Sequence, residues 1–128
     1  MADAVVLDSS ALLCLLNDEP GAERVAAALP GAIVSAVNLA ETVAKLRERG
    51  LTAAEVRSAL AGLSLEVRSF AADQAYAAGD LRPATRALGL SLGDRACLAL
   101  AAELGATALT ADRDWQRLDL GVAVEMVR

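Results

Sequence analysis

Four acidic residues of this sequence follow short apolar runs or lie near the start of helical stretches: Asp8, Glu41, Asp94 and Asp112. Glu41 and Asp94 lie on helical faces that are largely apolar, where an unpaired buried charge is strongly unfavourable. A bound cation would supply the missing partner, and carboxylate oxygens are the ligands that Mg²⁺ and Mn²⁺ prefer. The pattern therefore predicts a site for a divalent cation.

Helix capping is the competing interpretation of the same acids. The candidate capping pairs and single caps are Ser91 with Asp94, Asn38 with Glu41, and Asp8 and Asp112 alone. For any single acid, capping is the more common use. Capping does not require all four acids to lie at one end of a sheet, whereas a shared cation site does. The four together therefore favour the cation site.

Three further polar residues flank these acids. Asp114, two residues after Asp112, either completes the cation site or caps the last short helix, and the sequence leaves both alternatives open. Ser9 and Thr110 flank predicted strand ends, where their hydroxyls either orient a carboxylate or a metal-bound water or form a local turn hydrogen bond. All three are candidates to support the site.

Short β-rich runs alternate with helical patterns along the chain, which indicates an α/β fold. The predicted strands are Ala4–Leu7, Ala32–Ser35, Leu65–Arg68, Thr107–Thr110 and Val122–Val127. The predicted helices are Ser9–Asn17, Ala22–Leu29, Val37–Arg49, Ala53–Leu63, Ala71–Leu88 and Leu92–Leu104, with a short turn at Asp114–Arg117. The first run is apolar throughout, which is typical of parallel strands covered on both faces. Ligands bind beyond the carboxyl ends of such strands, and the acids lie there.

The composition indicates one domain with an aliphatic core. The chain has 128 residues, 55% of them hydrophobic, with one Phe, one Tyr and one Trp, and we expect a single domain over residues 1–128. Cys14 and Cys97 lie among Ala and Leu and are expected to be core residues. Histidine is absent, which excludes Ser-His-Asp and Cys-His catalysis and the usual zinc sites.

The sequence predicts neither a membrane span nor a signal peptide. No apolar run reaches the roughly 18 residues that a membrane span needs. The start, Met1-Ala2-Asp3, lacks the basic residues of a signal peptide. We therefore expect a soluble, cytoplasmic protein with no membrane partner.

Four short motifs follow one another along the chain. They are Val6-Leu7-Asp8-Ser9-Ser10-Ala11-Leu12, Asn38-Leu39-Ala40-Glu41, Leu92-Gly93-Asp94-Arg95-Ala96, and Leu109-Thr110-Ala111-Asp112 before Trp115. Together they resemble the PIN domain, and specifically the VapC-type toxins of toxin-antitoxin systems. Each motif alone is weakly diagnostic, but four in this order over essentially the whole chain make the resemblance specific.

The resemblance implies a five-stranded parallel sheet in the order 3-2-1-4-5 with helices on both faces. It also implies Mg²⁺- or Mn²⁺-dependent cleavage of RNA, a homodimer, and neutralisation by a cognate VapB-type antitoxin. Asp8, Glu41, Asp94 and Asp112 then form the acidic metal site, and all four match the family's motifs. This strand order places the topological switch between the first and fourth strands, where Asp8 and Asp112 would meet.

With no histidine to act as a base, the expected nucleophile is a water activated by the cation. The net charge of −5 argues against binding of nucleic acid, unless the cations and a basic rim face the RNA. The candidate residues for phosphate contacts are Arg82, Arg86, Arg95 and Arg113. The alternatives are surface pairing with Asp80 or Asp114 and, for Arg95, an internal partner.

Three other classes of protein are alternatives to this interpretation. A receiver-like signalling domain needs a lysine late in the chain, but the only lysine is Lys45. A haloacid-dehalogenase-like phosphatase needs Asp-x-Asp after the first strand, but Ser10 occupies the second position. The third alternative is a PIN fold that binds RNA or protein without catalysis, and the sequence leaves it open.

Overall fold

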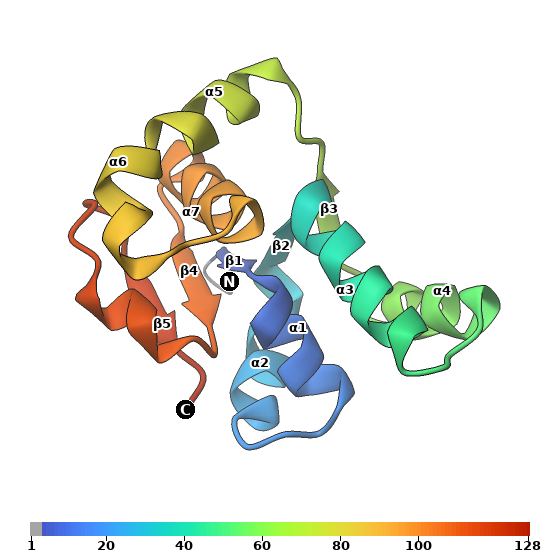
Figure 1. The fold of residues 1–128 in the computed structure, drawn as a ribbon. Helices are drawn as coiled ribbons and strands as arrows, with labels where there is room; N and C mark the ends of the chain where they lie inside the picture. Colours follow the sequence, from blue (N-terminus) through green and yellow to red (C-terminus); the bar gives the residue numbers. More distant parts are fainter. Residues whose placement is uncertain (1–3) are drawn as a thin grey trace.

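Five short strands form one parallel sheet in the order β3-β2-β1-β4-β5 (Figure 1). The structure is a computed structural model that describes residues 4–128. The strands are β1 Val5–Leu7, β2 Ala32–Ser35, β3 Glu66–Arg68, β4 Thr107–Thr110 and β5 Val124–Met126. Each neighbouring pair is parallel. The α/β class, the parallel sheet and its strand order are therefore confirmed.

Helices connect the strands and lie on both faces of the sheet. The α-helices are α1 Ser9–Leu16, α2 Ala22–Ala28, α3 Ala36–Glu48, α4 Ala53–Ala61, α5 Ala72–Asp80, α6 Arg82–Thr85 and α7 Leu92–Leu104. Short 3₁₀ helices are η1 Leu29–Gly31, η2 Arg86–Leu88 and η3 Arg113–Arg117. Within residues 4–128, no helix is long and apolar enough to cross a membrane. The expectation for Met1-Ala2-Asp3 lies outside the described residues.

Alternate residues of the strands point to opposite sides of the sheet and join two separate cores. Val5 and Leu7 of β1 belong to the core under α1 and α2. Val6 belongs to the core under α7. Cys14 and Cys97 are buried, one in each core, and both are free thiols, as predicted. Burial on both faces explains why β1 is apolar at every position.

The single helix predicted over Ala71–Leu88 is wrong, because the structure divides this stretch into α5, α6 and η2. Pro83 lies in the first turn of α6. Its ring carries no amide hydrogen, and inside a continuous helix it would clash with the carbonyl four residues earlier. A new helix therefore begins at Arg82. The segment ends at Gly89, whose φ of +65° lies in the left-handed region that glycine adopts readily.

Polar residues cap several helices, and three of these caps lie at or just after the end of a strand. Asp8 caps α1, Ser35 caps α3, Ser91 caps α7 and Asp112 caps η3. In Figure 1, α1, α3 and α7 converge beside β1. Helix N-termini carry partial positive charge, which favours carboxylates nearby. The fold thus gathers acidic side chains at the carboxyl edge of the sheet.

Candidate acidic site at the carboxyl edge of the sheet

Asp8 is the most deeply buried acid of the group, with a relative exposure of 2%. Its Oδ1 accepts hydrogen bonds from the backbone N–H of Ala11 at 2.8 Å and from the Ser10 hydroxyl at 2.7 Å. Its Oδ2 accepts from the hydroxyls of Ser10, at 2.9 Å, and Thr110. The carboxylate is therefore fixed by hydroxyl and amide donors from α1 and β4.

Burial raises the pKa of the Asp8 carboxyl from 3.8 to about 6. The hydrogen bonds from Thr110, Ala11 and Ser10 lower this pKa, and the negative charge of Asp94 raises it further. Among residues 4–128, Asp8 forms no ion pair. A buried carboxylate held by neutral donors alone is a group that a cation would stabilise.

Glu41 lies half-buried on α3, over the start of α7. Its Oε1 accepts from the Ser9 hydroxyl at 3.2 Å and from the Asn38 amide nitrogen at 3.2 Å. The same amide nitrogen donates to the backbone carbonyl of Gly93 at 3.0 Å. The pairing of Asn38 with Glu41 as a capping box is wrong, because α3 begins at Ala36 and its cap is Ser35.

Asp94 forms the capping box predicted for the start of α7. Its Oδ2 accepts from the backbone N–H of Ser91 at 2.9 Å, and its own N–H donates to the Ser91 hydroxyl at 3.1 Å. The cap and the acidic group are compatible, because the charge of Asp94 also acts on Asp8. Asp94 therefore lies within electrostatic range of the buried carboxylate.

The thiol of Cys97 is buried, and the charges of these three acids act on it. Burial raises its pKa well above the usual value, and the charges of Asp8, Asp94 and Glu41 raise it further. The three acids come from the end of β1, from α3 and from α7, so the fold assembles them from segments far apart in the sequence. These are three of the four residues predicted to form the site.

Asp112 adjoins the group through Thr110. Its backbone N–H donates to the Thr110 hydroxyl oxygen at 3.0 Å, and its Oδ1 accepts from the N–H of Asp114 at 3.0 Å. Asp112 is thus the cap of η3, and the alternative that Asp114 caps this helix is wrong because η3 begins at Arg113. Asp114 itself is exposed.

The acids are close enough to interact but are not gathered into one coordination sphere. Across residues 4–128, no three His, Cys, Asp or Glu side chains are placed to hold a metal ion. The donor set nevertheless fits a hard divalent cation, because it consists of carboxylate and hydroxyl oxygens around an uncompensated buried acid. Mg²⁺ typically takes only one or two protein carboxylates and keeps several waters. The residues present therefore fit such a cation.

The four arginines proposed for a basic rim make few internal contacts. Arg95 Nη1 donates to the carbonyl of Ala78 at 3.0 Å, so this arginine has the internal partner considered for it. Arg82 Nη1 reaches the carbonyl of Leu90 at 3.4 Å. The ion pairs within residues 4–128 are Arg24–Glu125, Arg68–Glu66 and Arg128–Glu19. The predicted pairing of the rim arginines with Asp80 or Asp114 is therefore absent from this region.

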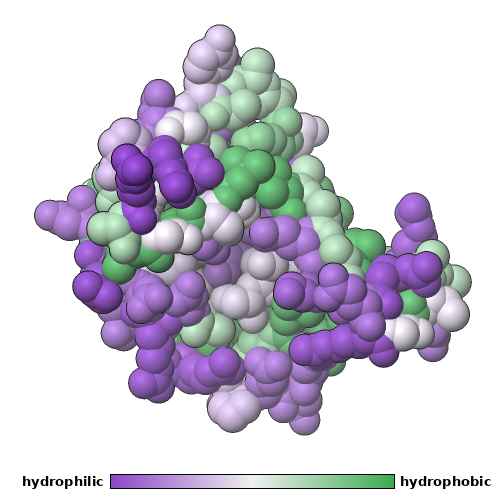
Figure 2. Space-filling model, viewed as in Figure 1, coloured by the Kyte–Doolittle hydropathy of each residue, from purple (hydrophilic) through white to green (hydrophobic). Residues whose placement is uncertain are grey.

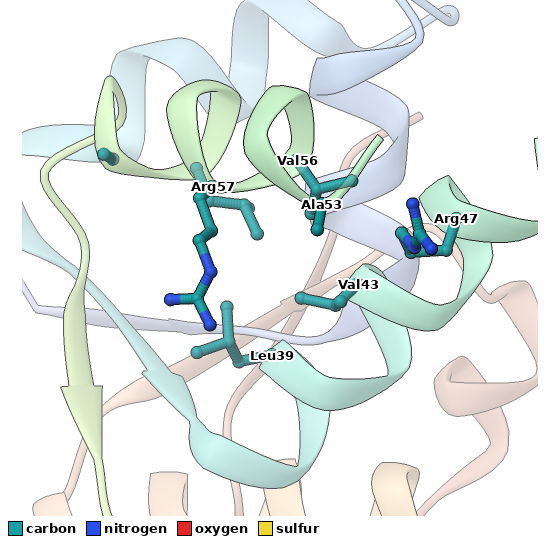
Figure 3. Close-up of a pocket in the computed structure, with 8 residues that line it drawn as sticks. Leu39, Val43, Arg47, Ala53, Val56 and Arg57 are labelled. Carbon is teal, nitrogen blue, oxygen red and sulfur yellow. The ribbon is translucent and has the colours of Figure 1, made fainter. Parts of the chain in front are cut away.

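A groove of about 530 Å³ lies away from the acids, between α3 and α4 (Figure 3). Its lining is aliphatic apart from two arginines: Leu39, Val43, Arg47, Ala53, Val56, Arg57, Leu60 and Ala61. Figure 2 shows hydrophobic residues between these helices, with hydrophilic residues around them. No acid lines the groove, so α3 presents an apolar face to α4 and a polar face, with Asn38 and Glu41, to α7.

Sequence reasoning identified Ser9 and Thr110 as supports of the carboxylates, and both donate to them. It missed Ser10, which binds both oxygens of Asp8 and also accepts from the N–H of Ala111 at 2.9 Å. Its position two residues after Asp8 was a usable signal, because Ser hydroxyls commonly bond to nearby polar groups. It also missed the roles of Asn38 and Gly93.

Comparison with known proteins shows the family and the fold of this chain. The sequence matches the PIN domain family over residues 5–120, and no curated protein matches it. The fold is similar to that of a toxin-antitoxin complex from Klebsiella pneumoniae (TM-score 0.76, 19% identity, 98% of each chain covered). It is also similar to DNA-bound VapBC from Salmonella typhimurium (TM-score 0.74, 20% identity, 98% of each chain).

A third similar structure is VapC20 from Mycobacterium tuberculosis, described as a sarcin-ricin loop cleaving toxin (TM-score 0.75, 22% identity, 89% of this chain and 94% of that chain). The chain therefore belongs to the PIN domain family. Its fold is that of the VapC-type toxins.

Proposed function

We propose that this PIN domain is an endoribonuclease that depends on Mg²⁺ or Mn²⁺, and the toxin of a VapBC-type module. The observation that carries the proposal is the placement of three acids at the carboxyl edge of the sheet. Asp8 and Glu41 accept from the adjacent hydroxyls of Ser10 and Ser9, and Asn38 links Glu41 to Gly93, the neighbour of Asp94. The similar VapC20, described as cleaving the sarcin-ricin loop, supports RNA as the substrate class.

Asp8, Glu41, Asp94 and Asp112 are the residues proposed to hold the cation. When bound, the cation supplies Lewis acidity, which polarises the phosphodiester and activates water for its hydrolysis. The protein fixes Asp8 through Thr110 and Ser10 before the cation arrives. Asp94 and Asp112 are held only by backbone N–H groups at helix starts, so their carboxylates can turn toward the ion. Asp114, exposed beside them, is a further proposed ligand.

The negative net charge is compatible with an RNA substrate if bound cations and exposed arginines face the phosphates. Arg82, Arg86 and Arg113 are exposed and have no acidic partner within residues 4–128. Guanidinium groups bind phosphate oxygens in a bidentate manner. These three residues are therefore the proposed basic rim, and Arg95, already bonded to a carbonyl, is a weaker candidate.

The first prediction is that the purified protein cleaves RNA when Mg²⁺ or Mn²⁺ is present and stops when a chelator removes the metal. Zn²⁺ is not required, because the donor set contains no His and its thiols are buried. Gel electrophoresis of end-labelled RNA measures this. Cleavage that continued undiminished in excess chelator would refute the metal mechanism.

A non-catalytic PIN module that binds RNA or protein is the second candidate function. The observation favouring it is that no three acids within residues 4–128 are placed to hold one ion. The two candidates differ in the same assay, because a binding module retains RNA in a filter-binding experiment with Mg²⁺ but leaves the RNA intact. Cleavage by wild type would exclude it.

We also propose a cognate VapB-type antitoxin as partner, and a cytoplasmic homodimer. The similar structures include toxin-antitoxin complexes. An acidic site can also bind an arginine of a partner protein, whose guanidinium group then occupies the position of the cation. Light scattering during size-exclusion chromatography tests the dimer.

The prediction for the antitoxin concerns the charge of the side chain at position 41. Glu41→Lys is expected to weaken antitoxin binding at least tenfold, about 1.4 kcal/mol, whereas Glu41→Gln weakens it less, because only the lysine repels an incoming arginine. Calorimetric titration of both variants with the cognate antitoxin measures this. Equal affinity for wild type and both variants would place the contact elsewhere.

A further inference from the structure

Gly93 lies in the first turn of α7, directly against the end of the Glu41 side chain. A Cβ atom added at Gly93 would overlap the Oε1, Oε2 and Cδ atoms of Glu41, which are the three nearest atoms to it. The backbone of Gly93 has no left-handed conformation that would call for glycine. Glycine is otherwise unfavourable in a helix. What glycine provides here is the space that the Glu41 carboxylate fills.

Asn38 also holds this carboxylate. Its amide nitrogen donates to Glu41 Oε1 and to the carbonyl of Gly93, at 3.2 and 3.0 Å. Both neighbours are acceptors, so the amide can face them only through its nitrogen. Asn38 is 1% exposed, and its Oδ1 has no hydrogen-bond partner among the described residues. The hydrogen bonds of this buried amide are therefore those of its nitrogen, to Glu41 and to Gly93.

We propose that Gly93 and Asn38 are positioning residues that together hold the Glu41 carboxylate over the start of α7. Gly93 leaves the space open, and Asn38 links the carboxylate to the Gly93 carbonyl, so that α3 and α7 share one fixed acid. The inference rests on the proposed function, because it takes Glu41 to be a ligand of the cation. Two uncharged residues then fix the position of the Glu41 carboxylate.

The substitution Gly93→Ala separates positioning from folding. The group it displaces is the end of a flexible side chain and not backbone, so Glu41 moves and the fold stays intact. Alanine is the better helix former, so the melting temperature without metal is expected to equal or exceed that of wild type. Gly79→Ala in α5 is the matched control, because a Cβ at Gly79 meets nothing within 4 Å.

The experiment is a titration of the full chain with Mn²⁺, followed by electron paramagnetic resonance. Gly93→Ala is expected to raise the Kd for Mn²⁺ by about 10- to 100-fold, the usual effect of losing a residue that orients a metal ligand. Gly79→Ala should leave the Kd unchanged. Asn38→Leu, which keeps the branched shape without the donor, should also raise the Kd. In a Glu41→Gln background, Gly93→Ala should have no further effect.

Three outcomes would count against the account, and they differ. Wild-type affinity for Mn²⁺ in Gly93→Ala would overturn the inference and leave the proposed function standing. An equally large effect of Gly93→Ala in the Glu41→Gln background would also overturn it, because the effect would then act through α7 or Asp94. Failure of wild type to bind Mn²⁺ at all would overturn the proposed function, and the inference with it.

Discussion

Asp8→Asn is expected to lower the rate of Mg²⁺-dependent RNA cleavage by about 10³-fold, equivalent to about 4 kcal/mol of transition-state stabilisation. Asp8 is the most deeply buried acid of the group, and the substitution removes its negative charge from the proposed cation site. Asparagine keeps the shape and can still accept from Ala11 and Ser10, so the fold is retained. Single-turnover cleavage of a defined RNA measures the effect.

The control for this substitution is Asp80→Asn, which neutralises an exposed acid at the end of α5. It changes the net charge by the same amount and is expected to leave the cleavage rate within about twofold of wild type, because exposed charges away from a site are screened. An equal loss of rate in both variants would show that net charge, and not the site, is responsible.

The second large expected effect is the pH dependence of the free energy of unfolding, which Asp8→Asn should change when metal is absent. Between pH 4 and pH 6 the folded protein holds a proton on Asp8 more readily than the unfolded chain, because burial raises the pKa from 3.8 to about 6. The stability that Asp8 contributes is therefore present below pH 4 and is lost as the pH rises through 6, by about 3 kcal/mol. In Asp8→Asn this loss should disappear.

Urea unfolding of wild type and Asp8→Asn in chelator, from pH 4 to pH 7.5, measures the difference between the two free energies of unfolding. The difference isolates Asp8, because the other acids titrate in both proteins. At pH 7.5 in chelator, the variant should be at least as stable as wild type. When Mg²⁺ replaces the chelator, it should stabilise wild type more than the variant. If the difference between the two free energies of unfolding stayed constant across this pH range, the pKa of Asp8 would not be raised in the folded protein.

The position of the site was predictable from local patterns. Asp8 ends an apolar run, Asp112 follows another, and the rule that sites lie at the carboxyl ends of parallel strands places both at one edge. The sheet order came from the resemblance, and the structure has it. The capping box at Ser91 and Asp94 was also readable from spacing, and it coexists with the acidic group.

The supports of the site were harder to predict, because they depend on packing between distant segments. Ser10 accepts from the N–H of Ala111, which is 101 residues away, and Asn38 contacts Gly93 across 55 residues. No periodicity encodes such contacts. The local sequence does not show whether a glycine in the first turn of a helix is merely tolerated there or leaves room for a neighbouring carboxylate.

The most direct test of the proposed ribonuclease is to sequence the 5′ ends of cellular RNA after brief induction of wild type and of Asp8→Asn at equal protein levels. We predict that wild type generates new RNA ends at a limited set of positions and that Asp8→Asn does not. The same new ends in both strains, or none with folded and abundant wild type, would contradict cleavage at this acidic site.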